Sequence, residues 1–135
     1  IKINSKINSR VIDELPLIFC LVCAKAKGVS YAKNLEGLRH KEQDRLKFVV
    51  KFLKMIGVKT IEKNNNLKIY GNPDLKLNRS YIIKNFMKDH RAFMLACVAA
   101  LTLGGKKWII HDIDSINTSF PNFISLLRNL GAKIH

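Results

Sequence analysis

The feature that most constrains the fold is the alternation along the chain of apolar segments with two different periodicities. Apolar residues at helical spacing predict helices at about residues 13–27, 39–56, 92–103 and 119–130. Short apolar runs between them predict strands at about residues 29–33, 58–62, 67–70, 81–83, 108–111 and 132–135. Because strands that alternate with helices pack in layers, we expect an α/β (α+β) fold. The order of helix, strand, helix, strand, strand in the first half returns in shortened form in the second half, which favours a repeated unit.

The chain carries a large excess of positive charge. Its 135 residues include 24 Lys and Arg against 10 Asp and Glu, a formal net charge of +14. Such a field attracts nucleic acid, and it also serves the binding of small anionic ligands. The cations are mostly lysines spread along the chain, and the sequence carries no motif of the usual nucleic-acid readers, so we expect no specific nucleic-acid partner. A basic nucleic-acid-binding α/β domain is the alternative hypothesis for function.

The start of the sequence and its apolar runs bear on where in the cell the protein is expected. The sequence starts at Ile1 rather than Met, inside a polar run, which we interpret as a piece of a longer protein. It shows no secretory signal pattern and no apolar run long enough to span a bilayer. We therefore expect a cytoplasmic protein without a membrane partner.

Three cysteines, Cys20, Cys23 and Cys97, raise the question of metal or redox chemistry. Cys20 and Cys23 form a C-x-x-C, but they lie within an apolar run and no second ligand pair accompanies them. Buried cysteines behave as small apolar groups, so we interpret the pair as core residues and predict no metal site.

A charged run from Leu38 to Arg45 leads into the second predicted helix, and we place it on the first turns of that helix. At helical spacing, Arg45 would neighbour both Lys41 and Glu42. Two cations beside the unpaired N–H groups of a helix start favour a phosphate or carboxylate, and a carboxylate there can exchange protons with the ligand. The alternative interpretation is a solvated helix start with ordinary ion pairs.

Four stretches resemble the enolpyruvyl transferase family, and within it the 5-enolpyruvylshikimate-3-phosphate (EPSP) synthases: residues 12–16, 38–45, 89–91 and 118–123. Their order and spacing are similar to the C-terminal third of those enzymes. The resemblance implies repeated βαβαββ units, with this chain supplying about two of the three units of a C-terminal domain, at about residues 11–72 and 73–135. The N-terminal domain of such an enzyme is absent from the sequence.

The resemblance also implies a reaction of the shikimate pathway, which leads to chorismate and the aromatic amino acids. The enolpyruvyl group of phosphoenolpyruvate moves to the 5-hydroxyl of shikimate 3-phosphate and phosphate is released, without a metal or organic cofactor. Arg45 and Arg91 match the arginines that hold phosphoenolpyruvate, and guanidinium groups suit its carboxylate and phosphate. Lys41 matches a ligand-contacting lysine and His90 a positioning histidine.

The same resemblance assigns the proton transfers to two carboxylates. Asp13 matches the one beside the 5-hydroxyl, where it also binds substrate, and Glu42 matches the one near the methylene carbon. Which of them donates and which accepts stays open. Thr118 stands where some members have a phosphate-binding lysine. Since further ligands of the family lie in its N-terminal domain, we expect these 135 residues alone to be inactive and the longer parent to be an active enzyme, acting as a monomer.

Overall fold

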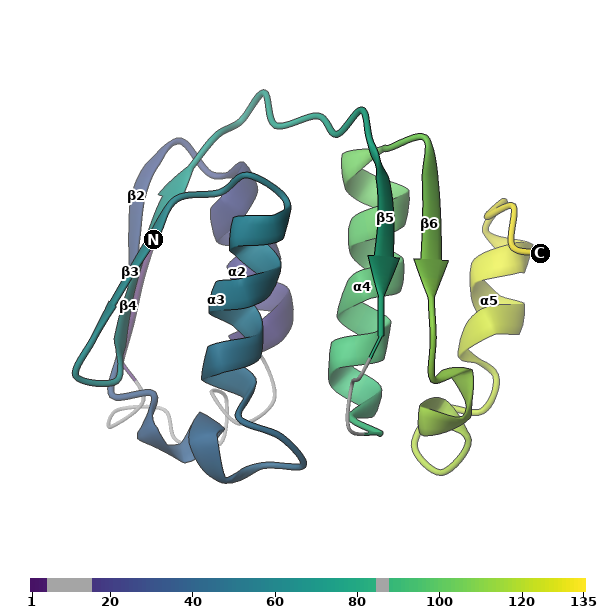
Figure 1. Cartoon of the computed structure of the whole chain (residues 1–135), viewed down its shortest axis with the longest axis horizontal. Helices are drawn as coiled ribbons and strands as arrows, with labels where there is room; N and C mark the ends of the chain where they lie inside the picture. The colour runs from purple at the N-terminus through teal and green to yellow at the C-terminus, as the bar shows by residue number, and fades with distance from the viewer. Residues whose placement is uncertain (5–15, 85–87) are drawn as a thin grey trace. The chain divides into compact units, whose positions relative to one another are not determined.

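The structure, a computed structural model, describes residues 1–4, 16–84 and 88–135, which divide into two compact units, residues 1–77 and 78–135 (Figure 1). The first unit contains β1 (Lys2–Asn4), α2 (Pro16–Lys25), β2 (Gly28–Lys33), the 3₁₀ helix η1 (Glu36–His40), α3 (Arg45–Met55), β3 (Thr60–Lys63) and β4 (Asn66–Gly71). The second contains β5 (Ser80–Ile83), α4 (His90–Leu103), β6 (Lys107–Ile110), the 3₁₀ helix η2 (Ile113–Ile116) and α5 (Phe123–Asn129). The mixed α/β architecture expected from the sequence is confirmed. Among the residues described, no helix has both the length and the apolar character needed to cross a membrane.

The sheet of the first unit has the strand order β1-β2-β4-β3. β1 runs parallel to β2, whereas β4 runs antiparallel to both β2 and β3. A tight turn joins β3 to β4, and its central residues Asn64 and Asn65 have φ values of 51° and 57°. Asparagine tolerates this left-handed conformation better than most residues, which explains a hairpin at this point.

The two faces of this sheet differ, as the alternation of side chains along a strand requires. Leu67 and Ile69 of β4 are buried on the face that α2 and α3 cover (Figure 1). On the other face Lys68 lies between two aromatic rings, with its Nζ 5.0 Å from the centroid of Tyr70 and 5.7 Å from that of Tyr31. The hydrogen bond from Lys68 lowers the pKa of the Tyr70 phenol. The core of this unit is therefore one layer of helix and sheet side chains.

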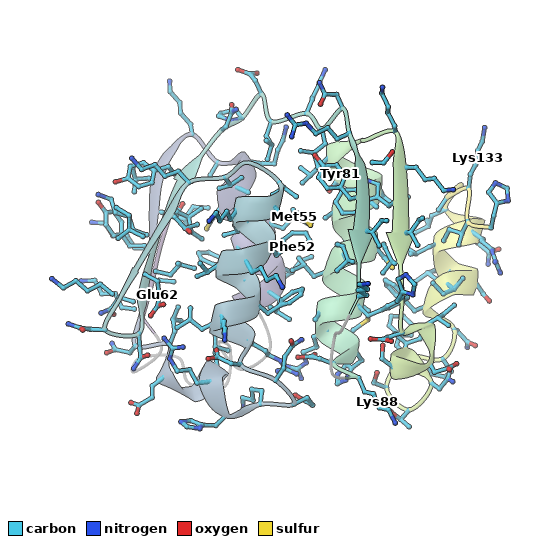
Figure 2. The ribbon with its side chains drawn as sticks, in the orientation of Figure 1. Phe52, Met55, Glu62, Tyr81, Lys88 and Lys133 are labelled. Atoms are coloured by element: carbon cyan, nitrogen blue, oxygen red, sulfur yellow. The ribbon has the colours of Figure 1, made fainter. Side chains whose placement is uncertain are left out.

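The second unit is built on two parallel strands, with Ser80 of β5 opposite Lys107 of β6 and Ile83 opposite Ile110. The helix α4 packs against β6 and η2 and buries Phe93 and other apolar side chains along its length. Near the C-terminal end of α4, the ring of Trp108 stacks on that of Tyr81, which is labelled in Figure 2, with the ring centroids 4.5 Å apart. The indole N–H of Trp108 also donates to the carbonyl of Gly104 over 2.7 Å. The aromatic pair thus joins both strands to the end of α4.

Glycines stand directly after the C-cap residues of α3 and α5. Gly57 and Gly131 have φ values of 80° and 95°, which few other residues adopt. The amide of Gly131 donates to the carbonyl of Arg128, and that of Ala132 donates to Leu127. This pair of bonds is the Schellman arrangement that satisfies the last carbonyls of a helix.

That arrangement also explains a prediction that is wrong. Residues 132–135 form no strand, because the backbone of Ala132 is used to close α5. The start of α5 differs too, since the helix begins at Phe123 rather than near residue 119. The amides of Ser119 and Phe120 both donate to the carbonyl of Ile116 and so continue the turn after η2.

Candidate active site

The charged run before α3 does not lie on the first turns of the helix, and that prediction is wrong. Residues 36–40 form η1, residues 41–44 form a loop, and α3 begins at Arg45. Asp44 is the N-cap, and its carboxylate accepts from the amide of Lys47 over 2.9 Å. A capping aspartate satisfies an otherwise unpaired N–H, so it fixes where the helix starts. We call residues 41–44, which carry Lys41 and Glu42, the site loop.

The predicted contact between Glu42 and Arg45 is present. Nη2 of Arg45 donates to Oε2 of Glu42 over 2.5 Å, and the side chain of Arg45 is 3% exposed whereas that of Glu42 is 46% exposed. Burying a guanidinium is costly unless its charge is compensated. Glu42 supplies that compensation from the solvent side, where its carboxylate remains accessible.

Arg45 lies where the positive charge of its side chain and the positive end of a helix dipole come together. Arg45 is the first residue of α3, and the positive end of the helix dipole lies there. A cation at this end is disfavoured by the dipole, whereas an anion is attracted by the dipole and by the charge of Arg45. In this arrangement the Glu42 carboxylate occupies the kind of position that an anionic ligand would take.

The start of α4 is built in the same way. Asp89 is the N-cap and is fully buried, and its Oδ1 accepts from the amides of Arg91 over 3.0 Å and Ala92 over 3.3 Å. His90 and Arg91, the first two residues of the helix, are half-buried. The cap holds the backbone of Arg91 directly, so the histidine and arginine occupy the first turn.

The predicted site residues fall into two groups. Lys41, Glu42 and Arg45 belong to the first unit, where the structure brings Glu42 and Arg45 into contact. His90 and Arg91 are neighbours in the second unit. Asp13 lies outside the described residues. The convergence of all six on one ligand stays a prediction.

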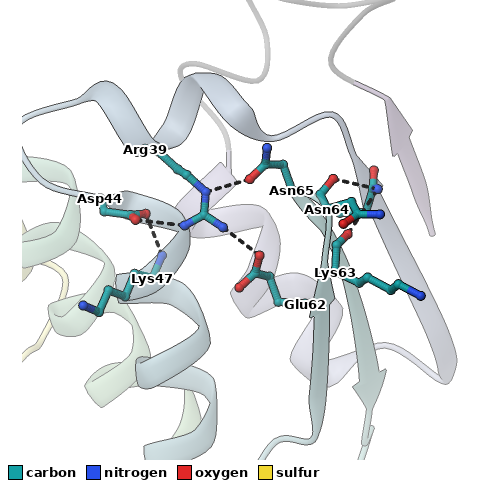
Figure 3. A network of polar contacts seen from close by, with 8 residues as sticks. Arg39, Asp44, Lys47, Glu62, Lys63, Asn64 and Asn65 are labelled. Atoms are coloured by element: carbon teal, nitrogen blue, oxygen red, sulfur yellow. Dashed lines mark hydrogen bonds and ion pairs between the residues drawn. The ribbon is translucent and has the colours of Figure 1, made fainter.

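Sequence reasoning gave Arg39 no role, yet it is the centre of a polar network (Figure 3). Its three guanidinium nitrogens donate to Asn65 over 2.7 Å, to Asp44 over 2.9 Å and to Glu62 over 2.7 Å. Arg39 belongs to the motif of residues 38–45, but its partners Glu62 and Asn65 come from the hairpin more than twenty positions later. No local pattern identifies such a contact.

The three cysteines are buried, as predicted from their apolar surroundings. Burial raises the pKa of Cys20 far above its ordinary value, and the nearby thiol of Cys23 adds to the effect. Burial also raises the pKa of Cys97 to about 12. Thiols that resist ionisation make poor nucleophiles and poor metal ligands. The C-x-x-C is therefore part of the core of α2.

The architecture matches that of a solved enzyme. The enolpyruvyl transferase NikO from Streptomyces tendae aligns with 89% of this chain, at a TM-score of 0.64 and 20% sequence identity, and the aligned part is 25% of its own length. The fold is therefore that of an enolpyruvyl transferase.

Similarity in sequence identifies the family within this fold. The model of the family EPSP synthase (3-phosphoshikimate 1-carboxyvinyltransferase) matches residues 3–127, and the chain belongs to this family. A 3-phosphoshikimate 1-carboxyvinyltransferase of Campylobacter jejuni is 41% identical over 124 residues, which are 92% of this chain and 27% of that protein. The enzyme of the same name from Caldicellulosiruptor bescii is 35% identical over 134 residues, 99% of this chain and 30% of that protein. The chain thus spans less than a third of the length of these relatives, and the matches give the nucleic-acid-binding alternative no support.

Proposed function

We propose that this chain is part of a longer EPSP synthase, which transfers the enolpyruvyl group of phosphoenolpyruvate to the 5-hydroxyl of shikimate 3-phosphate and releases phosphate. One observation supports this most directly in a chain of this family. Two helices each begin with a capping aspartate followed by an arginine in the first turn, Arg45 after Asp44 and Arg91 after Asp89. Such helix starts suit a ligand that carries both a carboxylate and a phosphate.

In this proposal the cations bind and orient the substrates. Arg45 and Arg91 hold phosphoenolpyruvate through paired N–H donors, which match the planar oxygens of a carboxylate and the oxygens of a phosphate. Lys41 adds a third positive charge from the site loop, and His90 positions the ligand at the start of α4. Held in this way, the reacting carbon stays at a fixed distance from the hydroxyl.

The two carboxylates carry the proton transfers. In the addition step the 5-hydroxyl oxygen bonds to C2 of phosphoenolpyruvate, the hydroxyl proton leaves, and the methylene carbon gains a proton to become a methyl group. In the elimination step the methyl group loses a proton, the C2–O bond to phosphate breaks, and the double bond forms again. Asp13 and Glu42 serve as the acid and base of these steps.

The pairing of Glu42 with Arg45 gives Glu42 a second role. Without ligand its carboxylate compensates the buried guanidinium. An arriving phosphate or carboxylate takes over that compensation, and Glu42 is then available to the methylene carbon. Replacing it as Glu42→Gln should therefore lower kcat by about 100-fold, the scale of general acid–base catalysis, with a much smaller effect on KM.

The proposal requires a second domain. Shikimate 3-phosphate carries its own phosphate, and further ligands for it are expected in the part of the relatives that this chain does not cover. The parent is expected to act in the cytoplasm as a monomer with phosphoenolpyruvate and shikimate 3-phosphate as substrates. The 135 residues alone should show no turnover.

Phosphate release tests the proposal. Both substrates are supplied to the parent protein and, separately, to this chain. We expect release only from the parent, and loss of that release in Arg91→Gln, with the exposed Arg128→Gln as the matched control. A folded parent without turnover would contradict the proposed reaction, and turnover by the isolated chain would contradict the need for a second domain.

A further inference from the structure

We infer that Arg39 is a positioning residue of the active site, which holds the site loop in the conformation that presents Lys41 and Glu42. The inference rests on the proposed function, since it concerns how that site is assembled. Arg39 lies in η1, the element that precedes the site loop, and its side chain is 30% exposed. It is not proposed to touch the substrate.

Arg39 links the segment before the site loop to the last residue of the loop. Arg39 precedes the loop, whereas Asp44 is its last residue and the N-cap of α3. Nη1 of Arg39 donates to Oδ2 of Asp44 over 2.9 Å, while Oδ1 of Asp44 accepts from the amide of Lys47. Both oxygens of one carboxylate are thus used, one toward each side. The residues between them are therefore held as a short closed loop.

Arg39 also fastens this closed loop to the β3–β4 hairpin. Nη2 donates to Glu62 of β3 and Nε donates to the side chain of Asn65 in the hairpin turn (Figure 3). The backbone reinforces the same junction, since the amide of Leu35 donates to the carbonyl of Asn65 over 2.8 Å. The amide of Asn34 also donates to Oδ1 of Asn66 over 3.0 Å. The hairpin therefore acts as an anchor for the segment that leads into the site loop.

The geometry of the three bonds explains why residue 39 is an arginine. Its three nitrogens donate in three directions to three separate elements, the start of α3, strand β3 and the β3–β4 turn. A rigid planar fork can serve all three, whereas the single nitrogen of lysine cannot span them in the same geometry. Arg39→Lys keeps the charge and removes the fork, so it separates electrostatics from positioning.

A positioning role predicts a loss of activity that exceeds any loss of stability. Misplacing a catalytic group by about 1 Å can cost about 100-fold in rate. In the parent enzyme we expect Arg39→Lys to lower kcat/KM for phosphoenolpyruvate by about 10- to 100-fold, mainly through kcat. Glu62→Ala should produce a smaller loss of kcat/KM, although Glu62 lies in β3 and outside the site loop. Glu36→Ala, which replaces an exposed acid in η1, is the matched control and should leave both constants unchanged.

A double-mutant cycle tests whether Arg39 and Glu62 act together. If Glu62 acts only through Arg39, the double variant should lose no more activity than Arg39→Lys alone. Multiplicative losses would overturn the inference, as would a lowered Tm in Arg39→Lys with unchanged kcat and KM.

A measurement without turnover separates this inference from the proposed reaction. Amide hydrogen exchange in the parent should be about 10-fold faster in Arg39→Lys at Lys47 and Leu35, whose N–H groups are held by Asp44 and Asn65. The amide of Ile69, inside the sheet, is the reference and should be unchanged. If the wild type lacks turnover yet shows this pattern, the proposed reaction fails and the anchoring of the loop stands. Unchanged exchange at Lys47 and Leu35 would overturn the anchoring itself.

Discussion

Removing the buried cap of α4 should weaken the second unit more than an ordinary surface substitution. In Asp89→Ala the amides of Arg91 and Ala92 lose the oxygen that accepts from them. Loss of an N-cap costs about 0.5–2 kcal/mol, and leaving a buried donor unpaired costs about 1–3 kcal/mol. The two costs are not added, because both describe the loss of the same hydrogen bonds. Since Asp89 is fully buried, we expect a value at the upper end of the first range, about 2 kcal/mol.

Urea unfolding followed by tryptophan fluorescence measures this loss. Trp108, the only tryptophan, is stacked on Tyr81 and bonded to Gly104 at the end of α4, so its emission reports on the second unit. With a urea dependence of about 1–3 kcal/mol per molar, the midpoint should fall by roughly 1 M. Asp89→Asn keeps one acceptor oxygen, and asparagine is a good N-cap, so its midpoint should lie closer to wild type.

A matched exposed carboxylate sets the background. Asp114 lies in η2 of the same unit, and Asp114→Ala should change the free energy of unfolding by no more than about 0.5 kcal/mol. If Asp89→Ala has as small an effect as this control, the capping argument is wrong. If Asp89→Asn is as destabilised as Asp89→Ala, the charge of Asp89 rather than its acceptor oxygen is what the helix start needs.

Three further outcomes follow from the structure. Gly71→Ala should lower the free energy of unfolding in urea by about 1–3 kcal/mol, because the new Cβ would overlap backbone oxygens at the end of α2. Gly28→Ala is the comparison: its Cβ would meet open space and only the φ of 83° is unfavourable, so the loss should be about 1 kcal/mol. Alkylation of Cys97 at pH 8 should be negligible until the chain unfolds, because its pKa is raised to about 12 in the folded state; rapid labelling under native conditions would contradict its burial. Lys68→Gln should raise the pKa of Tyr70 back toward 10.0, since the bond from Lys68 is the main cause of its lowering; an unchanged ultraviolet titration of the phenol would refute this.

The sequence predicted the elements whose formation depends on local pattern. The apolar spacing of residues 92–103 gave α4. The same kind of spacing placed the ends of two other helices near residues 56 and 130, next to Gly57 and Gly131, whose left-handed backbone ends α3 and α5. The contact of Glu42 with Arg45 was also predicted, although the reason assigned to it, shared helical turns, is wrong.

What the sequence did not predict depends on distant partners or on competing local bonds. The charged residues before Arg45 favour a helix by spacing, but Asp44 captures the amide of Lys47 and so excludes residues 41–43 from the helix. Arg39 is then free to reach Glu62 and Asn65, which folding brings next to it from a later hairpin. The tail strand failed because Ala132 bonds back to Leu127. In each case the hydrogen bonds that are formed cannot be read from the apolar spacing alone.

The two helix starts show why an arginine and a capping aspartate occur together. An arginine at the positive end of a helix dipole is electrostatically disfavoured, so the backbone beneath it needs another source of stability. Asp44 and Asp89 provide it by accepting hydrogen bonds from backbone amides in the first turn. The guanidinium groups of Arg45 and Arg91 therefore need not supply the capping. At each of the two helix starts the residue that fixes the backbone is thus distinct from the arginine, which is the same division of roles that we infer for Arg39.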